Sequence, residues 1–574
     1  MSKKIVIIGG VAAGPKAAVR CRRLMPDASI TLVDQDNFIS YGGCGIPYYV
    51  SGDVSDEKEL RSTSFHMLRD EVFFEKAKGV KTLTSTRALA IDRRKKTVTV
   101  EHLDTGALDT LEYDQLLLAT GSKPVILPIP GVDLDGVFTI SDLHKAIEIK
   151  DRIAKGRVGK AVVIGGGAIG LEMAEAFTDL WGVETAVVEY MDQLLPKAVS
   201  WTMATILTKH LRDKNVEVFL GEGAEEILAT DGRVSGLRTG KRTIEADLVV
   251  MAAGVRPRAE LAVEAGLHVG DRGGIVVNER LQTSDPDIYA AGDCIEIIHQ
   301  VTGKRFCAPF GSLANKEGRI VADNMAGIPS VFKGGVGNFI MKAFDISIGS
   351  VGLTRSAALA EGFDAEVSLT SPTDRAHFFP DHAVVCCELV FDRRTRRVLG
   401  LAGVGAMNDA LSVRLDAAAV AISAGATIED FANIEMCYAP PFSSAIDVLN
   451  AAAYVAENLC DNRMRQVDMA AFSAWMENPA SQPDWLVLDV RHPQQAEPLV
   501  ETFGRDIWRS LPYEQVRGRY AELPADRTLI IFCNAGSRSY EIQVFLDSVG
   551  YHNTLVLAGG YNVIHRMGAA WMPA

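Results

Sequence analysis

Residues 161–170, AVVIGGGAIG, decide the fold of this 574-residue chain. Four apolar residues predict a buried parallel strand, and the glycines predict a tight turn into a helix where a pyrophosphate can lie. The next apolar run, Thr185-Ala186-Val187-Val188, is followed by Glu189. The carboxylate of this residue is placed to accept a hydrogen bond from an adenosine ribose. Because an acid at this place repels a 2′-phosphate, NADH is expected to be preferred over NADPH. The residues predicted to bind this nucleotide are Gly165, Gly167, Gly170 and Glu189.

The same pattern opens the chain. Ile5-Val6-Ile7-Ile8 leads into Gly9-Gly10-Val11-Ala12-Ala13-Gly14, and a strand at residues 30–33 leads to Asp34. Val11 stands where such turns usually have their middle glycine. Two dinucleotide sites in one chain indicate an electron relay, and the partner of a hydride-donating nicotinamide is most simply a flavin. An FAD site is therefore predicted at Gly9, Val11, Gly14 and Asp34.

Composition restricts the class of protein. A length of 574 residues predicts three or four domains, and 48% hydrophobic with 23% charged residues is ordinary for a globular protein. The net charge of −14, without a long basic stretch, argues against nucleic-acid binding. No apolar run has the length of a membrane span or the form of a signal peptide. Nine cysteines at irregular spacing argue for a reducing compartment, so a cytoplasmic protein without a metal site is expected.

A single cysteine follows the first turn, in Ser40-Tyr41-Gly42-Gly43-Cys44-Gly45-Ile46-Pro47-Tyr48. Glycines on both sides allow a flat ring or a second sulfur to approach the backbone closely. Pro47 suits the first turn of a helix, and a helix N-terminus favours the reactive thiolate. Cys44 is therefore the candidate redox residue, with Ser40 and Gly43 as candidate substrate contacts.

Three later segments resemble motifs of one family of flavoproteins. Ile288-Tyr289-Ala290-Ala291-Gly292-Asp293 resembles the second flavin motif of the two-dinucleotide-binding flavoprotein disulfide reductases, in which the aspartate holds the ribityl chain. Ala119-Thr120-Gly121 and Ala253-Gly254-Val255-Arg256-Pro257 resemble the crossover segments between the flavin and nicotinamide domains of that family. The resemblance covers residues 1 to about 330 and implies cofactor contacts at Gly121, Gly254, Gly292 and Asp293.

Within this family, the lone cysteine resembles the coenzyme A-disulfide reductases, a group that also contains NADH oxidases and peroxidases. Members with an internal disulfide carry a second cysteine five positions on, where this chain has Tyr49. Residues 331–460 resemble the family's dimerisation domain. The resemblance implies a homodimer in which Tyr438 serves the other subunit's site and donates a proton to a leaving thiolate.

The resemblance also implies a coenzyme A site. Lys16, Arg20 and Arg23 share one face of the first helix and would bind the phosphates, although a solvated basic face is the alternative. Three departures disfavour coenzyme A disulfide as the substrate and favour a polysulfide or another small persulfide. Gly43 replaces an asparagine, Phe378-Phe379 replaces a tyrosine pair, and Ile446 replaces a lysine.

A fresh α/β pattern follows the polar residues 458–465. Leu529-Ile530-Ile531-Phe532 runs into Cys533-Asn534-Ala535-Gly536-Ser537-Arg538, a strand that enters an anion-binding loop and then a helix. Together with Leu557-Ala558-Gly559-Gly560, this loop resembles the rhodanese domain. Its six-residue length is typical of sulfur carriers, and the resemblance implies that Cys533 holds a sulfane sulfur stabilised by Arg538.

The predicted fold is therefore α/β, with two Rossmann-like FAD- and NAD-binding domains, an α+β dimerisation domain and a C-terminal α/β rhodanese domain. The predicted boundaries are 1–118 and 280–330 for the FAD domain, 119–279 for the NAD domain with its crossover segments, 331–457 for the dimerisation domain, 458–467 for a linker and 468–574 for the rhodanese domain.

The whole-chain resemblance is to NADH-dependent persulfide reductases. It implies that NADH reduces FAD, that Cys44 attacks the sulfur of a persulfide, polysulfide or coenzyme A disulfide, and that sulfide or a thiol is released. Cys533 would carry sulfane sulfur, with coenzyme A as a candidate shuttle. One alternative is an NADH oxidase or peroxidase that uses Cys44 as a sulfenic acid. Another makes the C-terminal domain a sulfur-sensing or docking module.

Overall fold

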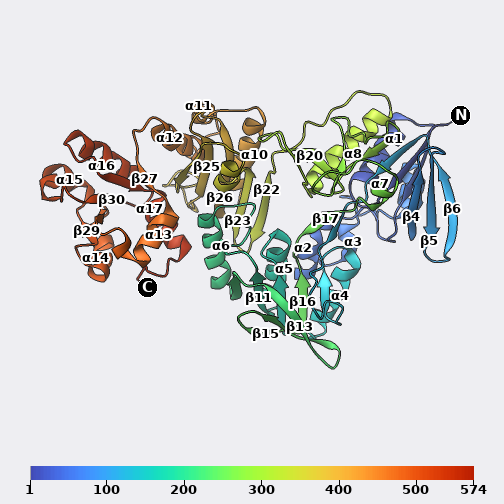
Figure 1. The fold of residues 1–574 in the computed structure, drawn as a ribbon, viewed down its shortest axis with the longest axis horizontal. Helices are drawn as coiled ribbons and strands as arrows, with labels where there is room; N and C mark the ends of the chain where they lie inside the picture. The colour runs from blue at the N-terminus through green and yellow to red at the C-terminus, as the bar shows by residue number, and fades with distance from the viewer. Residues whose placement is uncertain (1, 574) are drawn as a thin grey trace. The chain divides into compact units, whose positions relative to one another are not determined.

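The computed structural model describes residues 2–573, which form two compact units. Within the described residues, unit 1 comprises 2–190 and 222–335, and unit 2 comprises 191–221 and 336–573. Both units are mixed α/β, which confirms the predicted class (Figure 1). None of the helices between residues 2 and 573 is long and apolar enough to cross a membrane.

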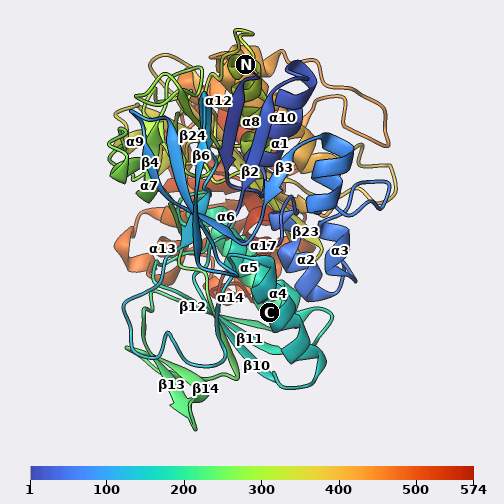
Figure 2. The same ribbon diagram turned by 90° about the vertical axis from the view of Figure 1, so that its right-hand side faces the viewer.

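Strand β1 (Lys4–Ile8) lies at the centre of the first sheet of unit 1. Its four apolar residues are at most 6% exposed, as expected for a central parallel strand. Helix α1 (Ala13–Leu24) follows the glycine turn and lies beside α8 (Gly311–Met325) (Figure 2). The strands of this parallel sheet, in spatial order, are β19 (Ile288–Ala290), β7 (Gln115–Leu118), β1, β2 (Ser29–Val33) and β3 (Lys81–Leu83).

Strand β10 (Lys160–Ile164) has the same place in the second sheet of unit 1. It pairs in parallel with β11 (Glu184–Glu189) and β16 (Leu248–Met251), and α5 (Ala168–Thr178) follows its glycine turn. Both Rossmann-like halves are therefore confirmed.

The two predicted crossover segments meet in unit 1. Strand β8 (Ser122–Pro124) follows the first and pairs antiparallel with β17 (Val255–Pro257), which belongs to the second. Segments about 130 positions apart in the sequence therefore form one two-stranded ribbon beside the flavin motif.

Unit 2 contains a five-stranded antiparallel sheet in the predicted dimerisation domain. Helices α10 (Asp409–Ser423) and α12 (Val448–Cys460) pack on it. Cys386 and Cys387 are 0% and 1% exposed within this sheet, as expected for core residues. The strands in order are β22 (Phe339–Ala343), β23 (Ile346–Gly352), β26 (Val398–Ala406), β25 (Cys386–Asp392) and β24 (Ala365–Thr370).

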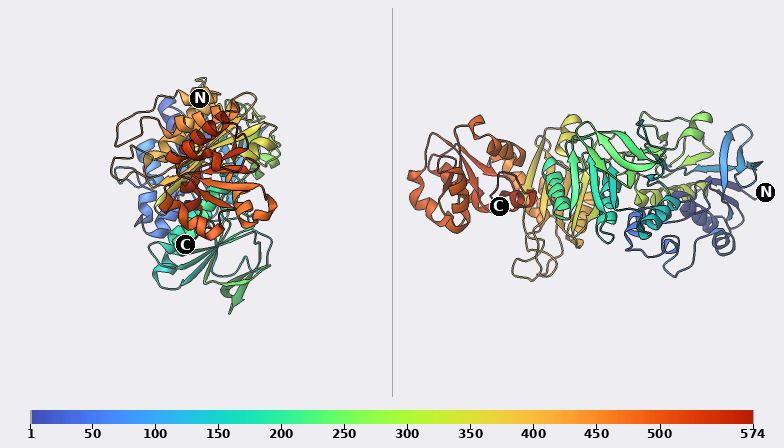
Figure 3. Two further views of the ribbon diagram at one scale, coloured as in Figure 1. Left: turned by 90° about the vertical axis from the view of Figure 1, so that its left-hand side faces the viewer. Right: turned by 90° about the horizontal axis from the view of Figure 1, so that it is seen from below.

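The rhodanese part of unit 2 is a parallel sheet surrounded by helices (Figure 3). Helix α16 (Ser537–Ser548) follows β30, and α17 (Gly560–Met567) follows β31. The strands in order are β27 (Gln466–Val467), β31 (Thr554–Leu557), β30 (Thr528–Phe532), β28 (Trp485–Asp489) and β29 (Trp508–Ser510).

Two predicted boundaries differ from the structure. Helix α6 (Trp201–Asp213), inside the predicted NAD domain, groups with unit 2 because its apolar face packs against α17 and β26. The predicted linker 458–467 is shorter, since α12 extends to Cys460 and β27 begins at Gln466. Polar residues at the end of a helix resemble a linker in sequence because both are exposed to water.

The rhodanese domain is joined to the dimerisation sheet by one buried and two half-buried hydrogen bonds. The Ser371 hydroxyl donates to the carbonyl of Gly559 at 2.9 Å, and the Asn562 amide donates to the carbonyl of Ser371 at 3.2 Å. Gln466 adds a bond from its side-chain amide to the carbonyl of Val367 at 2.8 Å. Within unit 2 the domain is therefore docked and does not hang from a long tether.

Candidate functional site

Steric contacts explain the glycines of the two nucleotide turns. Gly165 has φ +114°, and a Cβ there would lie 2.4 Å from the carbonyl oxygen of Ala252. A Cβ on Gly170 would lie 2.1 Å from the carbonyl oxygen of Gly165, so only glycine lets the helix approach the turn. The predicted Gly9 and Gly14 are equally constrained, with contacts of 2.0 and 1.9 Å.

The middle position of each turn is different. A Cβ on Gly167 would meet nothing within 4 Å, so this glycine leaves open space at the start of α5. Val11 occupies the matching position of the first turn and is 37% exposed. Both helix N-termini are thus accessible to a phosphate group, and the Val11 side chain does not fold into the core.

The acid after each second strand is tied to its turn. The backbone N–H of Gly10 donates to Asp34 at 2.5 Å, and that of Gly166 donates to Glu189 at 2.6 Å. Burial raises the pKa of Asp34. A cavity of about 150 Å³ lies between Gly9, Asp34 and Arg258, and this volume admits an aromatic ring. The residues present therefore fit an adenine dinucleotide at the first turn.

Asp293 lies at the ribbon between the two halves of unit 1. It accepts a hydrogen bond from the hydroxyl of Ser122 at 3.0 Å, next to Gly121, and burial raises its pKa. Gly292 has φ +83°, and its N–H donates to the Glu317 carboxylate at 2.6 Å. The structure thus brings the predicted residues Gly121 and Asp293 together. On the other side of the ribbon, the carbonyl of the predicted Gly254 accepts from the N–H of Val125 at 2.9 Å.

Cys44 lies in a single 3₁₀ turn, Gly43–Gly45, just before α2 (Ile46–Ser51), where Pro47 occupies the first turn as predicted. Cys44 is exposed, and a Cβ built on Gly311 would lie 3.7 Å from its sulfur. Gly311 is the first residue of the 15-residue helix α8, so the thiol faces a helix N-terminus. Sequence reasoning missed Gly311, because nothing in the sequence links residues so far apart.

Whereas the N-terminus of α8 favours the thiolate of Cys44, the acidic residues near it favour the neutral thiol. Partial withdrawal from water raises the pKa of Cys44, and the carboxylates of Glu172 and Asp293 raise it further. Burial, followed by the charge of Glu175, raises the pKa of Glu172 to about 7. Glu172 is a second residue that sequence reasoning missed; its signal is an acid in the otherwise apolar first turns of α5.

The residues predicted to contact the substrate differ in their exposure to solvent. Ser40 is buried with φ +52°, and its N–H donates to the carbonyl of Gly10, so its backbone supports the first turn. Gly43 is exposed next to Cys44. On α1, Lys16 and Arg23 are exposed, whereas Arg20 forms an ion pair with Asp323 at 2.7 Å. Of the three basic residues expected on this face, Lys16 and Arg23 are therefore the two that lie open to a phosphate.

Tyr438 belongs to unit 2, where its side chain is 54% exposed. Large apolar side chains around it in the sequence are also exposed, namely Phe378, Met407, Val413, Phe442 and Ile446. Exposed large apolar side chains mark an interaction surface where they form one contiguous patch.

Cys533 lies at the floor of a loop between β30 and α16. It is 1% exposed, and the N–H of Gly536 donates to its sulfur at 3.1 Å. Arg538 is half-buried in the first turn of α16. The loop is fixed from behind, because Tyr561 and Asn562 donate their N–H groups to the carbonyls of Cys533 and Asn534. A loop that directs an N–H at a buried sulfur suits an anionic sulfur, and the role of Cys533 as a sulfur carrier stays a prediction.

Comparison with known families identifies the class of protein. Residues 3–305 match the pyridine nucleotide-disulphide oxidoreductase model, residues 340–449 match the dimerisation domain of that family, and residues 472–567 match a rhodanese-like domain. The chain therefore belongs to the pyridine nucleotide-disulphide oxidoreductase family, with a rhodanese-like domain at its C-terminal end. It is an oxidoreductase of the class that uses FAD and NAD(H), which confirms both predicted cofactors.

Individual relatives narrow the comparison. The chain is 35% identical to the NAD(P)H coenzyme A polysulfide/persulfide reductase of Pyrococcus horikoshii over 79% of this chain and 98% of that one. It is 33% identical to an NADH oxidase of Methanocaldococcus jannaschii over 80% of this chain and all of that one. A solved NAD-dependent persulfide reductase from A. fulgidus is 37% identical, with a TM-score of 0.91, over 98% of this chain and 99% of that one.

Proposed function

We propose that this protein is an NADH-dependent, FAD-containing persulfide or polysulfide reductase. One observation carries the proposal: a chain with the Cys44 turn also has the Cys533 cradle, and the persulfide reductase structure matches both parts together. The NADH oxidase relative matches 80% of this chain, whereas the persulfide reductase structure covers 98% of it. An oxidase has no use for a loop that stabilises an anionic sulfur.

Cys44 is the residue that meets the substrate. Its thiolate attacks the outer sulfur of R–S–SH, forms Cys44–S–SH and releases R–S⁻; two electrons and protons then restore the Cys44 thiol and release hydrogen sulfide. When bound, FAD supplies the path for the two electrons of NADH. The N-terminus of α8 beside Gly311 supports the thiolate, and Tyr438 from the second copy of the homodimer protonates the leaving thiolate.

The remaining residues hold the cofactors and the sulfur donor. Gly9, Gly14, Asp34 and Asp293 bind FAD, and Gly165, Gly167, Gly170 and Glu189 bind NADH. Cys533 carries sulfane sulfur, and Arg538 stabilises it. Coenzyme A is the proposed carrier, held by Lys16 and Arg23, because Arg20 is engaged with Asp323.

The protein is proposed to act as a homodimer, because exposed apolar side chains lie across its dimerisation domain. All nine cysteines are free, which supports a cytoplasmic location.

One comparison tests the function. NADH oxidation by the pure protein is measured with coenzyme A persulfide, polysulfide, coenzyme A disulfide and oxygen side by side. We expect the persulfide and polysulfide to give the highest kcat/KM, with one sulfide released per NADH. Oxygen consumption that exceeds both would establish the oxidase instead.

A further inference from the structure

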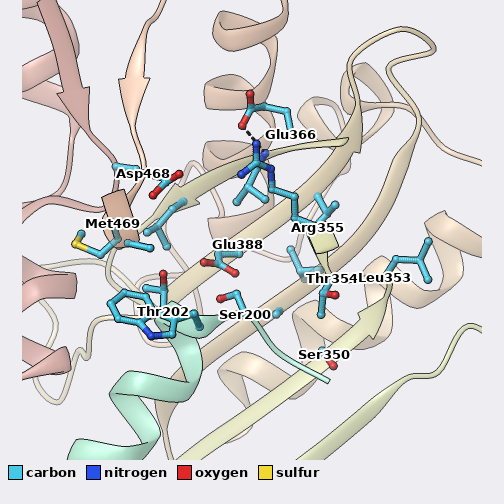
Figure 4. Close-up of a pocket in the computed structure, with 18 of the residues that line it drawn as sticks. Ser200, Thr202, Ser350, Leu353, Thr354, Arg355, Glu366, Glu388, Asp468 and Met469 are labelled. Atoms are coloured by element: carbon cyan, nitrogen blue, oxygen red, sulfur yellow. Dashed lines mark hydrogen bonds between the residues drawn. The ribbon is translucent and has the colours of Figure 1, made fainter. Parts of the chain in front are cut away.

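A cavity of about 180 Å³ lies inside unit 2, where the dimerisation sheet meets the start of α6 and the start of α13 (Met469–Glu477) (Figure 4). Its wall is mainly apolar and includes Val367, Leu369 and Leu401. An apolar cavity of about 150 Å³ is enough to hold benzene. The space therefore suits a small organic molecule. Neither Cys44 nor Cys533 lines it.

Glu388 points into this cavity from β25, between Ser200 and Asp468 (Figure 4). The residue is 6% exposed, and burial, with the nearby charge of Asp468, raises its pKa to about 7, although the hydroxyl of Ser200 favours the charged form. A carboxyl group buried with so little support destabilises the fold unless a partner satisfies it.

Three further residues of the wall contribute acceptors. Gln466 donates its amide N–H to Val367, which leaves its side-chain oxygen buried without a partner among residues 2–573. Asp468 caps α13 by accepting from the N–H of Ala471 at 2.7 Å. Glu366 lies at the edge, 3.4 Å from Arg393. Arg355 is the basic residue of the wall, and its Nε donates to the carbonyl of Ala365 at 3.3 Å.

We propose that this cavity binds a small organic ammonium ion. Its N–H groups donate to Glu388, Asp468 and Gln466, and its apolar body lies against Val367 and Leu369. Because Glu366 is paired with Arg393, the wall retains two carboxyl groups, Glu388 and Asp468, against the guanidinium of Arg355, which favours a cation. The buried side-chain oxygen of Gln466, which has no partner among residues 2–573, favours a ligand that carries N–H donors. The ligand would contact the dimerisation sheet, α6 and the first turn of α13, so its binding stabilises the docked position of the rhodanese domain.

Three probes of one shape test the charge of the ligand. Benzylammonium, benzyl alcohol and benzoate are titrated by calorimetry into the full-length FAD-bound protein at about pH 8, where Glu388 is ionised. We expect benzylammonium to bind about tenfold more tightly than benzyl alcohol, and benzoate not to bind. At about pH 6 Glu388 is mostly protonated, so this preference for the cation should fall.

Matched variants locate the site. Glu388→Gln keeps the shape and should lose about tenfold in benzylammonium affinity, whereas Glu366→Gln, at the paired edge, should change it less than about twofold. Thermal unfolding verifies that both variants fold, and benzylammonium should raise the Tm of the wild type and of Glu366→Gln only. Limited proteolysis in the segment 461–465 should slow in the same two proteins. Binding of benzoate as tight as that of benzylammonium, unchanged affinity in Glu388→Gln, or no binding by any probe would overturn the proposal.

Discussion

The two cysteines of the proposed reaction occupy opposite environments. Cys44 is exposed, faces the start of α8, and has two carboxylates nearby that raise its pKa. Cys533 is buried in a loop that donates an N–H to its sulfur and carries Arg538 one turn later. A thiol that must gain and lose a partner in each cycle is accessible, whereas a thiol that stores an anionic sulfur is enclosed by donors. The difference supports the proposed roles, with electron entry at Cys44 and sulfur storage at Cys533.

The largest effect should come from exchanging each cysteine for serine. Cys44→Ser should lower NADH-driven reduction of every persulfide and disulfide by about a thousandfold or more, because the nucleophile is lost. Cys533→Ser should leave reduction of small persulfides within about twofold and abolish sulfur transfer to thiols. NADH oxidation and thiocyanate formation from thiosulfate and cyanide separate the two activities.

Equal loss of reduction in both variants would mean that the two cysteines form one obligatory redox path. Flavin absorbance of each purified variant controls for lost cofactor.

A second experiment asks whether Cys44 draws its proton from another subunit. Chains with Cys44→Ser are mixed with chains carrying Tyr438→Phe, and the mixed dimers are isolated by tags. If the site is shared, one of the two sites in each mixed dimer is restored to wild type, and reduction should recover to about half of the wild-type rate. Tyr438 serving its own chain predicts no recovery. The exposed position of Tyr438 makes recovery the expected result.

A change at the NADH site should affect the NADH-driven reduction at Cys44 but not the sulfur transfer at Cys533. Glu189→Gln keeps an acceptor for the N–H of Gly166 and removes the charge that opposes a 2′-phosphate. The ratio of kcat/KM for NADH over NADPH should fall by about tenfold. Sulfur transfer by Cys533 should not respond. Asp192→Asn, three residues on, is the matched control and should keep the wild-type ratio.

The smallest expected effect concerns Glu172. The negative charge of Glu172 raises the pKa of Cys44, so Glu172→Gln should lower it. The rising limb of the pH–rate profile for persulfide reduction should then move to lower pH, with a rate about twofold higher on that limb. The pH profile of sulfur transfer should stay unchanged. Glu184→Gln, an exposed acid on β11, is the control; a limb that does not move in Glu172→Gln would remove this residue from the site.

Much of the fold follows from local chemistry in the sequence. The turns at Gly9 and Gly165 could be predicted because no other residue fits against the carbonyls of Ala119 and Ala252. The position of Pro47 in the first turn of α2 and the cradle around Cys533 are also local features. In each case a short sequence motif marks the position, even where the contact that requires it comes from a distant segment.

Contacts between distant segments could not be predicted in the same way. Gly311 reaches the Cys44 sulfur only through the packing of α8, and α6 joins unit 2 through its apolar face against α17. The engagement of Arg20 by Asp323 likewise depends on α1 lying beside α8. A helical pattern gives the buried face of a helix, but not the element that covers it.

The short segment 461–465 and the Ser371–Gly559 hydrogen bond bear on how sulfur travels. A rhodanese domain anchored in this way does not swing on a flexible tether, so a mobile thiol carrier is the expected vehicle for the sulfur of Cys533. The rate at which sulfur leaves Cys533 then depends on the concentration and the length of that carrier. Free thiols in solution compete with the carrier for this sulfur. An added excess of a short thiol should therefore divert sulfur from Cys533 before it is reduced, whereas a carrier with a long flexible arm keeps the two steps coupled.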